Sequence, residues 1–334
     1  MNQEKNTKYV VTGGAGFIGS NLVDLLIDKN IEVHVIDNFI SGKKENCNSK
    51  ALYHKLDLSD SSNFEDIKSI LKNCDGVFHL AALARVQESI DNPLHFEKNN
   101  TLSTINILKA CADMGVKRLV YSASSSAYGD TSKLPSLEHD PINPISPYAM
   151  QKYYGEVCCK TFSNVYGIQT VSLRYFNVYG ERQNMDGGYP LVMCVFAKQR
   201  LNNQPMTIRG DGEQRRDFTH VYDIARANYL AMQSTKVGSG DILFIVDLEN
   251  TQQLFDLSKM EVETRSRKVE IIESLVSKGS DSEFRLLDEK LALIESKKRH
   301  DIASSQFEQS SVTAPVTGVI SKMDVTNIDQ VVQK

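Results

Sequence analysis

The chain has 334 residues, of which 41% are hydrophobic and 24% charged, values ordinary for a globular protein with a sizeable core. A formal net charge of −4 and a pI near 6.0 argue against a general nucleic-acid binder. No secretory signal precedes the first predicted strand, and no run approaches the roughly 18 apolar residues that span a bilayer, so we expect a cytoplasmic protein without membrane contact.

The six cysteines form no Cys-x-x-Cys pair and suit neither a zinc site nor a disulfide framework. We therefore expect reduced thiols and no metal site. These residues are Cys47, Cys74, Cys111, Cys158, Cys159 and Cys194.

Strands and helices alternate along the first half of the chain. Short apolar runs predict strands, and apolar residues at helical spacing predict the helices between them. The predicted strands cover 8–12, 31–37, 51–58, 76–82, 118–124 and 168–180. The predicted helices cover 20–30, 61–73, about 94–114 and 146–167, the last opened by Ser146 and Pro147. This alternation predicts an α/β fold with a doubly wound parallel sheet.

The sequence changes character after about residue 240. The segment that follows is charged, poor in glycine and helical in period, and it predicts two amphipathic helices joined at 278–280. Short strands and turns are expected after it. We therefore place a domain boundary near 240, with one domain over 1–240 and a disjunct, atypical helical segment over 241–334.

A glycine-rich turn between the first strand and helix predicts a nucleotide site. Gly13, Gly16 and Gly19 let the backbone approach a pyrophosphate, whose charge is met by the helix N-terminus. Asp37, at the end of the next strand, is placed to accept the ribose hydroxyls and to repel a 2′-phosphate, which favours NAD over NADP. Lys43 and Lys44 are the counter-signal, although loop lysines are usually solvated.

Other polar residues near the strand ends allow two interpretations. Asp57 can accept from the adenine amino group or cap a helix. His79 lies within an apolar strand, where a hydrogen-bonded core histidine is expected. Asn100, or its neighbour Asn99, lies inside a helix, a poor place for asparagine unless its amide bonds something specific.

Tyr148 and Lys152 are four residues apart on a predicted helix and so share a face. The ammonium of Lys152, together with the positive nicotinamide ring of an oxidised cofactor, can lower the tyrosine pKa from about 10 toward neutrality. Ser124, Ser125 and Ser126 end a strand upstream, where a hydroxyl can share the moving proton or simply make a turn. With Tyr148 and Lys152 downstream, a catalytic hydroxyl is favoured, Ser124 first.

Asn177 lies near the end of the last predicted strand, and Arg209 and Arg216 follow that strand. Each can be a surface residue, but together they predict an anionic substrate, because arginine binds phosphates in a bidentate manner.

Seven strings carry a resemblance to a known family, in order and with sensible gaps: TGGAGFIGSN, DNFISGKKEN, HLAA, SASSSAYGD, SPYAMQKYYGE, LRYFNVYGERQ and RRDFTHVYD. They resemble the extended short-chain dehydrogenase/reductase family, which has a Rossmann sheet, and within it the NAD-dependent UDP-hexose 4-epimerases. The resemblance covers about residues 7–235.

The resemblance implies a redox loop at carbon 4 of a UDP-hexose, either the UDP-glucose/UDP-galactose or the UDP-GlcNAc/UDP-GalNAc pair, through a 4-keto intermediate. Tyr148 is the implied base, Lys152 lowers its pKa and holds the nicotinamide ribose, and Ser124 aids proton transfer. Relatives often form homodimers through the helix pair that includes the Tyr-x-x-x-Lys helix. The expected catalytic residues are Tyr148, Lys152 and Ser124. The expected cofactor-binding residues are Gly13, Gly16, Phe17, Ile18, Gly19, Asp37, Asn38, Asp57, Leu58, Leu80, Ala81, Ala82, Asn100, Ser122, Tyr148, Lys152 and Tyr175. The expected substrate-binding residues are Ser124, Ser125, Ser126, Asn177, Arg209 and Arg216.

The serine run also separates the relatives by chemistry. Sugar-nucleotide 4,6-dehydratases carry Asp-Glu at the positions of Ser125 and Ser126, and UDP-glucuronate decarboxylases keep Glu at the second. Here neither acid is present, so epimerisation is favoured over dehydration or decarboxylation.

The C-terminal segment departs from this family. Residues from about 255 onward are similar to a fragment of periplasmic adaptor (membrane fusion) proteins of haemolysin-type secretion systems, in KVEIIESLVSKGS, LDEKLALIESKKR and TAPVTGVISKMDVTNIDQVVQ. The combination indicates a fusion, natural or from sequence assembly, in which the usual substrate lobe is incomplete. The alternatives are a divergent substrate lobe, an NAD-binding protein with impaired catalysis, or a structural component of secretion.

Overall fold

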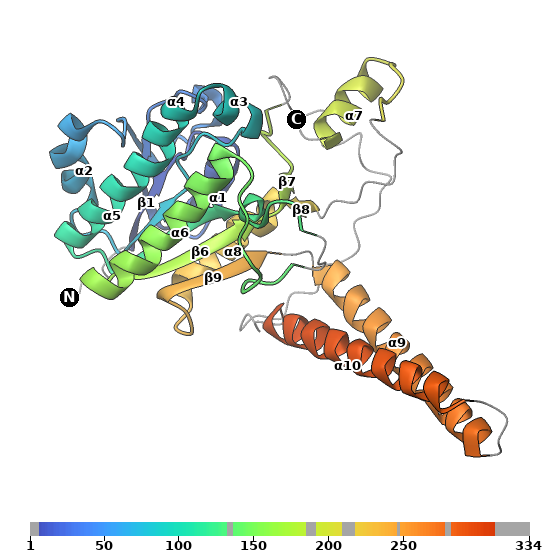
Figure 1. Cartoon of the computed structure of the whole chain (residues 1–334). Helices are drawn as coiled ribbons and strands as arrows, with labels where there is room; N and C mark the ends of the chain where they lie inside the picture. Colours follow the sequence, from blue (N-terminus) through green and yellow to red (C-terminus); the bar gives the residue numbers. More distant parts are fainter. Residues whose placement is uncertain are drawn as a thin grey trace. The chain divides into compact units, whose positions relative to one another are not determined.

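A computed structural model describes residues 7–131, 136–184, 192–208, 218–245, 248–277 and 282–310. Its centre is a seven-stranded sheet in the order β3-β2-β1-β4-β5-β6-β9, with all neighbouring strands parallel (Figure 1). The predicted doubly wound parallel sheet is therefore confirmed. The strands are β1 (Lys8–Thr12), β2 (Glu32–Asp37), β3 (Leu52–Lys55), β4 (Gly76–His79), β5 (Arg118–Ser124), β6 (Gln169–Tyr175) and β9 (Ser239–Ile245), with a separate parallel pair of β7 (Asn177–Tyr179) and β8 (Phe218–His220).

The helices follow the strands in sequence, as a doubly wound sheet requires. They are α1 (Phe17–Asp28), α2 (Phe64–Leu71), α3 (Val86–Asp91), α4 (Pro93–Glu97), α5 (Ser103–Met114), α6 (Pro147–Tyr166), α7 (Val192–Leu201), α8 (Val221–Gln233), α9 (Leu248–Ser277) and α10 (Glu283–Ser310). A π-helical turn over Lys98–Leu102 joins α4 to α5, and a 3₁₀ turn over Ser125–Tyr128 follows β5.

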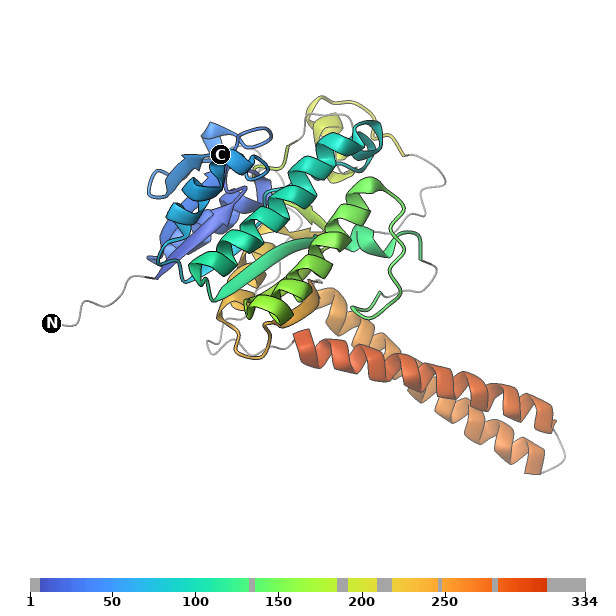
Figure 2. The ribbon, with the colours of Figure 1, turned by 60° about the vertical axis from the view of Figure 1, so that its left-hand side comes forward.

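Side chains alternate between the two faces of the sheet and build two cores. Val11 and Val35 join Leu22 of α1 and Ile224 of α8 on one face. On the other face, one core holds residues of α2, α5 and α6 together with strand residues: Val10, Ile36, Ile67, Ile107, Leu108 and Cys159. Helices α5 and α6 lie side by side across this second face (Figure 1 and Figure 2).

Helix α6 begins as the sequence predicts. The hydroxyl of Ser146 accepts a hydrogen bond from the backbone N–H of Ala149 at 3.2 Å, and Pro147 occupies the first turn. An N-cap of this kind satisfies a backbone donor that the helix itself leaves unpaired. The start of the helix, and hence the position of Tyr148, is fixed locally.

The chain divides into two compact units, 1–245 and 246–334. Strand β9 crosses residue 240 and pairs with β6, so the sheet extends five residues past the position at which the βα pattern was expected to stop. A readable strand was missed there because GDILFIVD stands next to charged helical sequence.

The described part of the second unit is an antiparallel hairpin of α9 and α10. Ion pairs join the two helices at Glu261–Arg299, Arg265–Glu289, Lys268–Glu289 and Glu273–Lys290. The pair that lies earliest on α9, Glu261–Arg299, lies latest on α10, as an antiparallel arrangement requires. The strands expected near the C-terminus lie outside the described residues.

Candidate active site

The predicted site residues follow the carboxyl ends of parallel strands, which meet at one edge of a sheet. Strand β1 pairs with β2 on one side and β4 on the other, so the chain reverses direction across the sheet at β1. In open α/β sheets this switch point is where ligands bind.

The glycine turn after β1 is too tight for side chains. Gly13 has φ +72°, and a Cβ there would lie 2.7 Å from the backbone nitrogen of Ala81. A Cβ on Gly19 would lie 2.2 Å from the carbonyl oxygen of Gly13. Helix α1 begins just after Gly16, and no side chain caps its amino end, where Phe17 and Ile18 form the first turn. This turn fits a bound anion such as a pyrophosphate.

Asp37 at the end of β2 is held by backbone donors. Its Oδ2 accepts from the N–H of Ala15 at 2.9 Å, and its Oδ1 accepts from the N–H of Phe39 at 2.8 Å. Each carboxylate oxygen has further acceptor capacity. The same carboxylate can therefore order the turn and accept ribose hydroxyls. Asn38 accepts from the N–H of Ile40 at 3.1 Å and so forms a local turn.

Asp57 is not a helix cap: Asp60 caps the 3₁₀ turn that follows, and Asn63 occupies the cap position of α2. The Oδ1 of Asp57 accepts from both the N–H (2.8 Å) and the hydroxyl (2.6 Å) of Ser59, which makes a turn ahead of α2. Leu58 beside it is buried. Adenine recognition by Asp57 stays a prediction.

His79 is a satisfied core histidine, as the sequence predicts. One ring nitrogen lies 2.8 Å from the hydroxyl of Thr12 and the other 3.0 Å from that of Thr104. Burial lowers the pKa of His79 to about 3. Thr12 also accepts from the N–H groups of Leu80 and Ala81, and this fixes the expected small-residue wall, Leu80–Ala82, against the glycine turn.

Asn100 is buried in the π-helical turn, and its amide does bond something specific. Oδ1 accepts from the N–H of Leu83 at 2.7 Å, while Nδ2 donates to the carbonyl of Leu83 and to Oε1 of Gln151, each at 3.0 Å. Asn100 thus links the segment after β4 to α6. A contact between Asn100 and the cofactor stays a prediction. Its neighbour Asn99 is half-buried.

Tyr148, Lys152 and Ser124 come together at the end of β5. Tyr148 and Lys152 are buried on the same face of α6, and the Ser124 side chain lies close enough to the Tyr148 phenol to lower its pKa. The ammonium of Lys152 donates to the carbonyl of Ser122 at 2.8 Å and lies 5.2 Å from the centre of the Tyr121 ring. This arrangement holds a phenol, a hydroxyl and a buried cation beside one sheet edge.

The pKa of Tyr148 is raised, whereas a lowered value was expected from the sequence. Burial raises the pKa, the Ser124 side chain opposes that effect, and the Lys152 ammonium is not among the causes. Burial lowers the pKa of Lys152 to about 8. An effective base at neutral pH therefore needs the positive nicotinamide ring, because the chain alone does not lower the pKa of the phenol.

Ser122 and Tyr175 are the remaining expected cofactor contacts. Tyr175 exchanges hydrogen bonds with the amide of Asn228 on α8, and burial raises its pKa to about 12. Its hydroxyl therefore stays protonated, and the ring is held in place.

Only part of the expected substrate site can be described. Ser126 donates to the Ser124 hydroxyl through its backbone (3.2 Å) and its own hydroxyl (2.8 Å), so the serine run also makes the turn considered from the sequence. Ser125 lies in the same turn, and Asn177 starts β7. Arg209 and Arg216 lie outside the described residues.

Two residues near the reactive pair were missed from the sequence. The buried hydroxyl of Ser89 in α3 accepts from the backbone N–H of Tyr148 at 3.1 Å. Gln151 lies between Asn100 and Glu97, to which its Nε2 donates at 3.2 Å. Gln151 could have been found from the sequence, because it is a polar residue beside Lys152 on the predicted helix. Nothing in the sequence indicates that Ser89 contacts α6.

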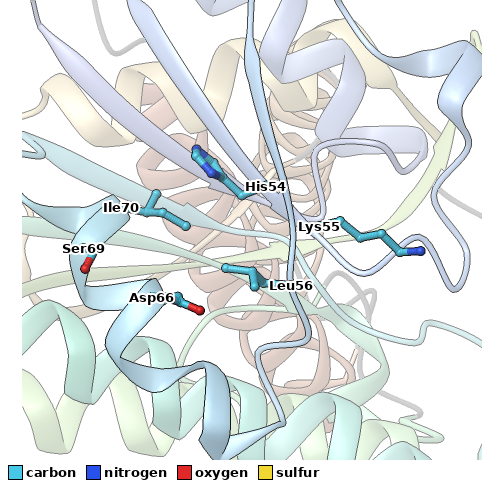
Figure 3. Close-up of a pocket in the computed structure, with 6 residues that line it drawn as sticks. All are labelled: His54, Lys55, Leu56, Asp66, Ser69 and Ile70. Atoms are coloured by element: carbon cyan, nitrogen blue, oxygen red, sulfur yellow. The ribbon is translucent and has the colours of Figure 1, made fainter.

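A surface hollow of about 350 Å³ lies elsewhere, between β3 and α2 (Figure 3). It is lined by His54, Lys55, Leu56, Asp66, Ser69 and Ile70, none of which is a predicted site residue. Among the described residues no group of three or more His, Cys, Asp or Glu side chains can hold a metal ion, and no described helix is long and apolar enough to cross a membrane.

Comparison with known proteins gives a consistent result. A family model described as the NAD dependent epimerase/dehydratase family matches residues 9–245. A protein of Methanocaldococcus jannaschii with the provisional name UDP-glucose 4-epimerase is 40% identical over 265 residues, which are 78% of this chain and 84% of that protein.

Two solved structures are also similar. The UDP-N-acetylglucosamine 4-epimerase of Methanobrevibacter ruminantium, in complex with UDP-N-acetylmuramic acid, is 41% identical with a TM-score of 0.68, covering 72% of this chain and 77% of that one. The UDP-glucose 4-epimerase of Thermus thermophilus in complex with NAD is 34% identical with a TM-score of 0.64, covering 72% and 78%.

Proposed function

The chain belongs to the NAD-dependent epimerase/dehydratase family, and we propose that it catalyses the 4-epimerisation of a UDP-hexose. The observation that carries the proposal is the meeting of buried Tyr148 and Lys152 with the partly buried Ser124, at the same sheet edge as the glycine turn. The relatives that act on UDP-glucose and UDP-N-acetylglucosamine support the substrate class.

The residues present fit NAD. The glycine turn at Gly13 and Gly19 has no room for side chains, and no side chain caps the start of α1, so its backbone N–H groups can bind a pyrophosphate. The Asp37 carboxylate suits an unmodified adenosine ribose rather than a 2′-phosphate. Leu80, Ala81 and Ala82 would form the wall beside the cofactor, with Lys152 and Tyr175 near the nicotinamide end. When bound, NAD supplies a hydride acceptor that can return the hydride to the sugar.

The chain's own groups move the proton. Tyr148 takes the proton from the hydroxyl on carbon 4, with the Ser124 hydroxyl sharing it, as carbon 4 loses its hydride. Lys152, held by the Ser122 carbonyl, would hold the nicotinamide ribose, and the positive nicotinamide ring would favour the phenolate. The pocket holds the resulting 4-keto sugar while it turns over, and Tyr148 returns the proton when the hydride comes back to the other face. Asn177, Arg209 and Arg216 are the proposed diphosphate contacts.

An interconversion assay tests this function. Purified protein is incubated with UDP-galactose and, separately, with UDP-N-acetylglucosamine, and the sugars are separated by chromatography. Interconversion of either pair supports the proposal and identifies the hexose. Absence of both reactions in protein shown by absorbance to carry NAD contradicts it.

A second function is favoured by one observation. The family match ends at residue 245, at the boundary of the first compact unit. If the substrate lobe is incomplete, the chain binds NAD without appreciable turnover. A thermal shift on adding NAD but none on adding a UDP-sugar would select this alternative.

A homodimer through α5 and α6 is part of the proposal. Met150, Tyr154 and Val157 are exposed on α6 at 4-then-3 spacing, the pattern of a helix that packs against another helix. A cytoplasmic location is supported by the six cysteines, all of which are free thiols. The resemblance of the segment after about 255 to periplasmic adaptor proteins stays a prediction.

A further inference from the structure

A buried ion pair lies directly behind the reactive residues. Arg174 of β6 and Glu156 of α6 each have side chains only 1% exposed. Their contact is bidentate, with Nε to Oε1 at 2.8 Å and Nη2 to Oε2 at 2.7 Å. A buried ion pair adds little net stability compared with apolar residues of similar size, so stability alone does not explain why Arg174 and Glu156 lie here.

The third guanidinium nitrogen reaches the turn that carries the serines. Nη1 of Arg174 donates to the hydroxyl of Tyr128 at 2.6 Å and to the carbonyl of Glu138 at 3.2 Å. The guanidinium also lies 4.7 Å from the centre of the Tyr128 ring. Tyr128 is the last residue of the 3₁₀ turn that contains Ser125 and Ser126, and its hydroxyl donates to the carbonyl of Leu137 at 2.9 Å.

The other end of the ion pair belongs to the reactive helix. Glu156 is buried with Tyr148 and Lys152, and the three are spaced four residues apart on α6. In the sheet, Arg174 is the register partner of Ala123, next to Ser124. One guanidinium therefore contacts both halves of the site, namely the helix with the base and the turn with the serine hydroxyls.

We propose that Glu156 and Arg174 are positioning residues for the epimerisation, fixing the Tyr148 face of α6 relative to the Ser124–Ser126 turn. This inference rests on the proposed function. A displacement of about 1 Å between reacting groups can lower a rate by roughly 100-fold, so a rigid buried link at this position has catalytic value.

Glu156 also acts on the charge of Lys152. Its negative charge favours the Lys152 ammonium, as does Cys159, whereas burial disfavours the ammonium. The other ionisable groups near Lys152 are Tyr148 on α6 and Tyr121 on β5, and the neutral His79 on β4 also senses its charge. With the pKa of Lys152 near 8, we expect activity to fall above about pH 8, because the cation is lost.

Two variants separate position from charge. Glu156→Gln removes the carboxylate charge, so kcat should fall roughly 10-fold to 100-fold with KM for the UDP-sugar changed less than about 3-fold, and the basic limb of the pH profile should move to lower pH. Arg174→Lys keeps a charge but loses the bidentate contact, so kcat should fall without that move of the limb. Glu65→Gln, in an exposed pair with Lys68 on α2, is the matched control and should change neither.

The kcat values are calculated per molecule of NAD-bound protein, so that a smaller fraction of folded protein is not mistaken for a lower kcat. If the ion-pair variants do not fold, Tyr128→Phe leaves the pair intact and removes the hydroxyl that links Arg174 to the serine turn and that donates to the Leu137 carbonyl. It should lower kcat and speed hydrogen exchange of the Ser126 amide, without a change in bound NAD.

Two measurements that do not depend on catalytic turnover test the positioning role separately from the proposed function. NMR titration of the Lys152 ammonium and hydrogen exchange of the Ser126 amide are measured in wild type and in each variant that folds. If these change while wild type does not interconvert UDP-hexoses, the positioning role stands and the proposed function fails. If wild type is active and the folded variants match it in kcat, pH limb and exchange, the positioning role is overturned.

Discussion

The sheet unit and the helical hairpin are stabilised in different ways. The sheet has a buried core on each face, and its buried ionisable side chains Arg174 and His79 have partners within hydrogen-bond distance. The described hairpin has few buried side chains, among them Val269 and Ile272, and large apolar residues such as Phe284 (77% exposed) face outward. The difference shows that a reactive site needs a scaffold in which several contacts fix the position of each side chain.

The largest effect is expected at the reactive tyrosine. Tyr148→Phe keeps the ring but removes the hydroxyl that moves the proton, so turnover should fall by roughly 1,000-fold or more. Chromatography of the UDP-sugars measures the rate, and absorbance measures bound NAD, which should be unchanged. A variant with more than a tenth of wild-type activity would place the base elsewhere.

A proline in α9 tests whether the hairpin contributes to the site. Ile272→Pro breaks a helix interior at a buried position and should cost the hairpin about 3 kcal/mol. Helical circular dichroism should fall while turnover stays within about 3-fold of wild type, with Ile271→Ala at the exposed neighbouring position as the control. All thirteen tyrosines precede residue 230, so tyrosine fluorescence follows the sheet unit alone. A parallel loss of turnover would show that the two units act together.

Acid should destabilise the sheet unit through His79. Its folded-state pKa of about 3 lies below the ordinary value of 6.5, so stability is complete above pH 6.5 and is lost as the pH falls toward 3. The free energy of unfolding should decrease by up to about 1.4 kcal/mol for each pH unit in that window. Urea unfolding followed by tyrosine fluorescence should show a shallower slope for His79→Gln than for wild type, and equal slopes would contradict the assignment.

The smallest effect is expected from an acid in the hairpin that has two cationic partners. Glu289 accepts from Lys268 at 2.7 Å and from Arg265 at 3.2 Å, and the side chains of both partners are partly exposed to water. Glu289→Gln should lower the Tm of the helical signal by less than about 3 °C. A larger shift would mean that these charges, rather than the apolar contacts, hold the hairpin together.

The order of elements and the main site residues could be predicted from local patterns. Alternating strands and helices, the glycine spacing and the pair Tyr148 and Lys152 are each visible within a short stretch of sequence. The apolar run of β9 stands next to charged helical sequence, and its pairing with β6 joins residues about seventy positions apart, so local patterns did not place it in the sheet. Arg174 stands in an apolar strand, which signals a buried charge that needs a partner, but the sequence does not say that the partner is Glu156.

The position of β9 has a consequence for how this protein avoids aggregation. Among the described strands β9 pairs with β6 alone, so its outer edge presents backbone donors and acceptors that another chain can use to add a strand. The pairing is irregular at Thr170 and Val171, where the register shifts. Such an irregularity increases local twist and makes an edge a poorer template. A change that straightened this edge would favour strand addition between molecules without touching any reactive group.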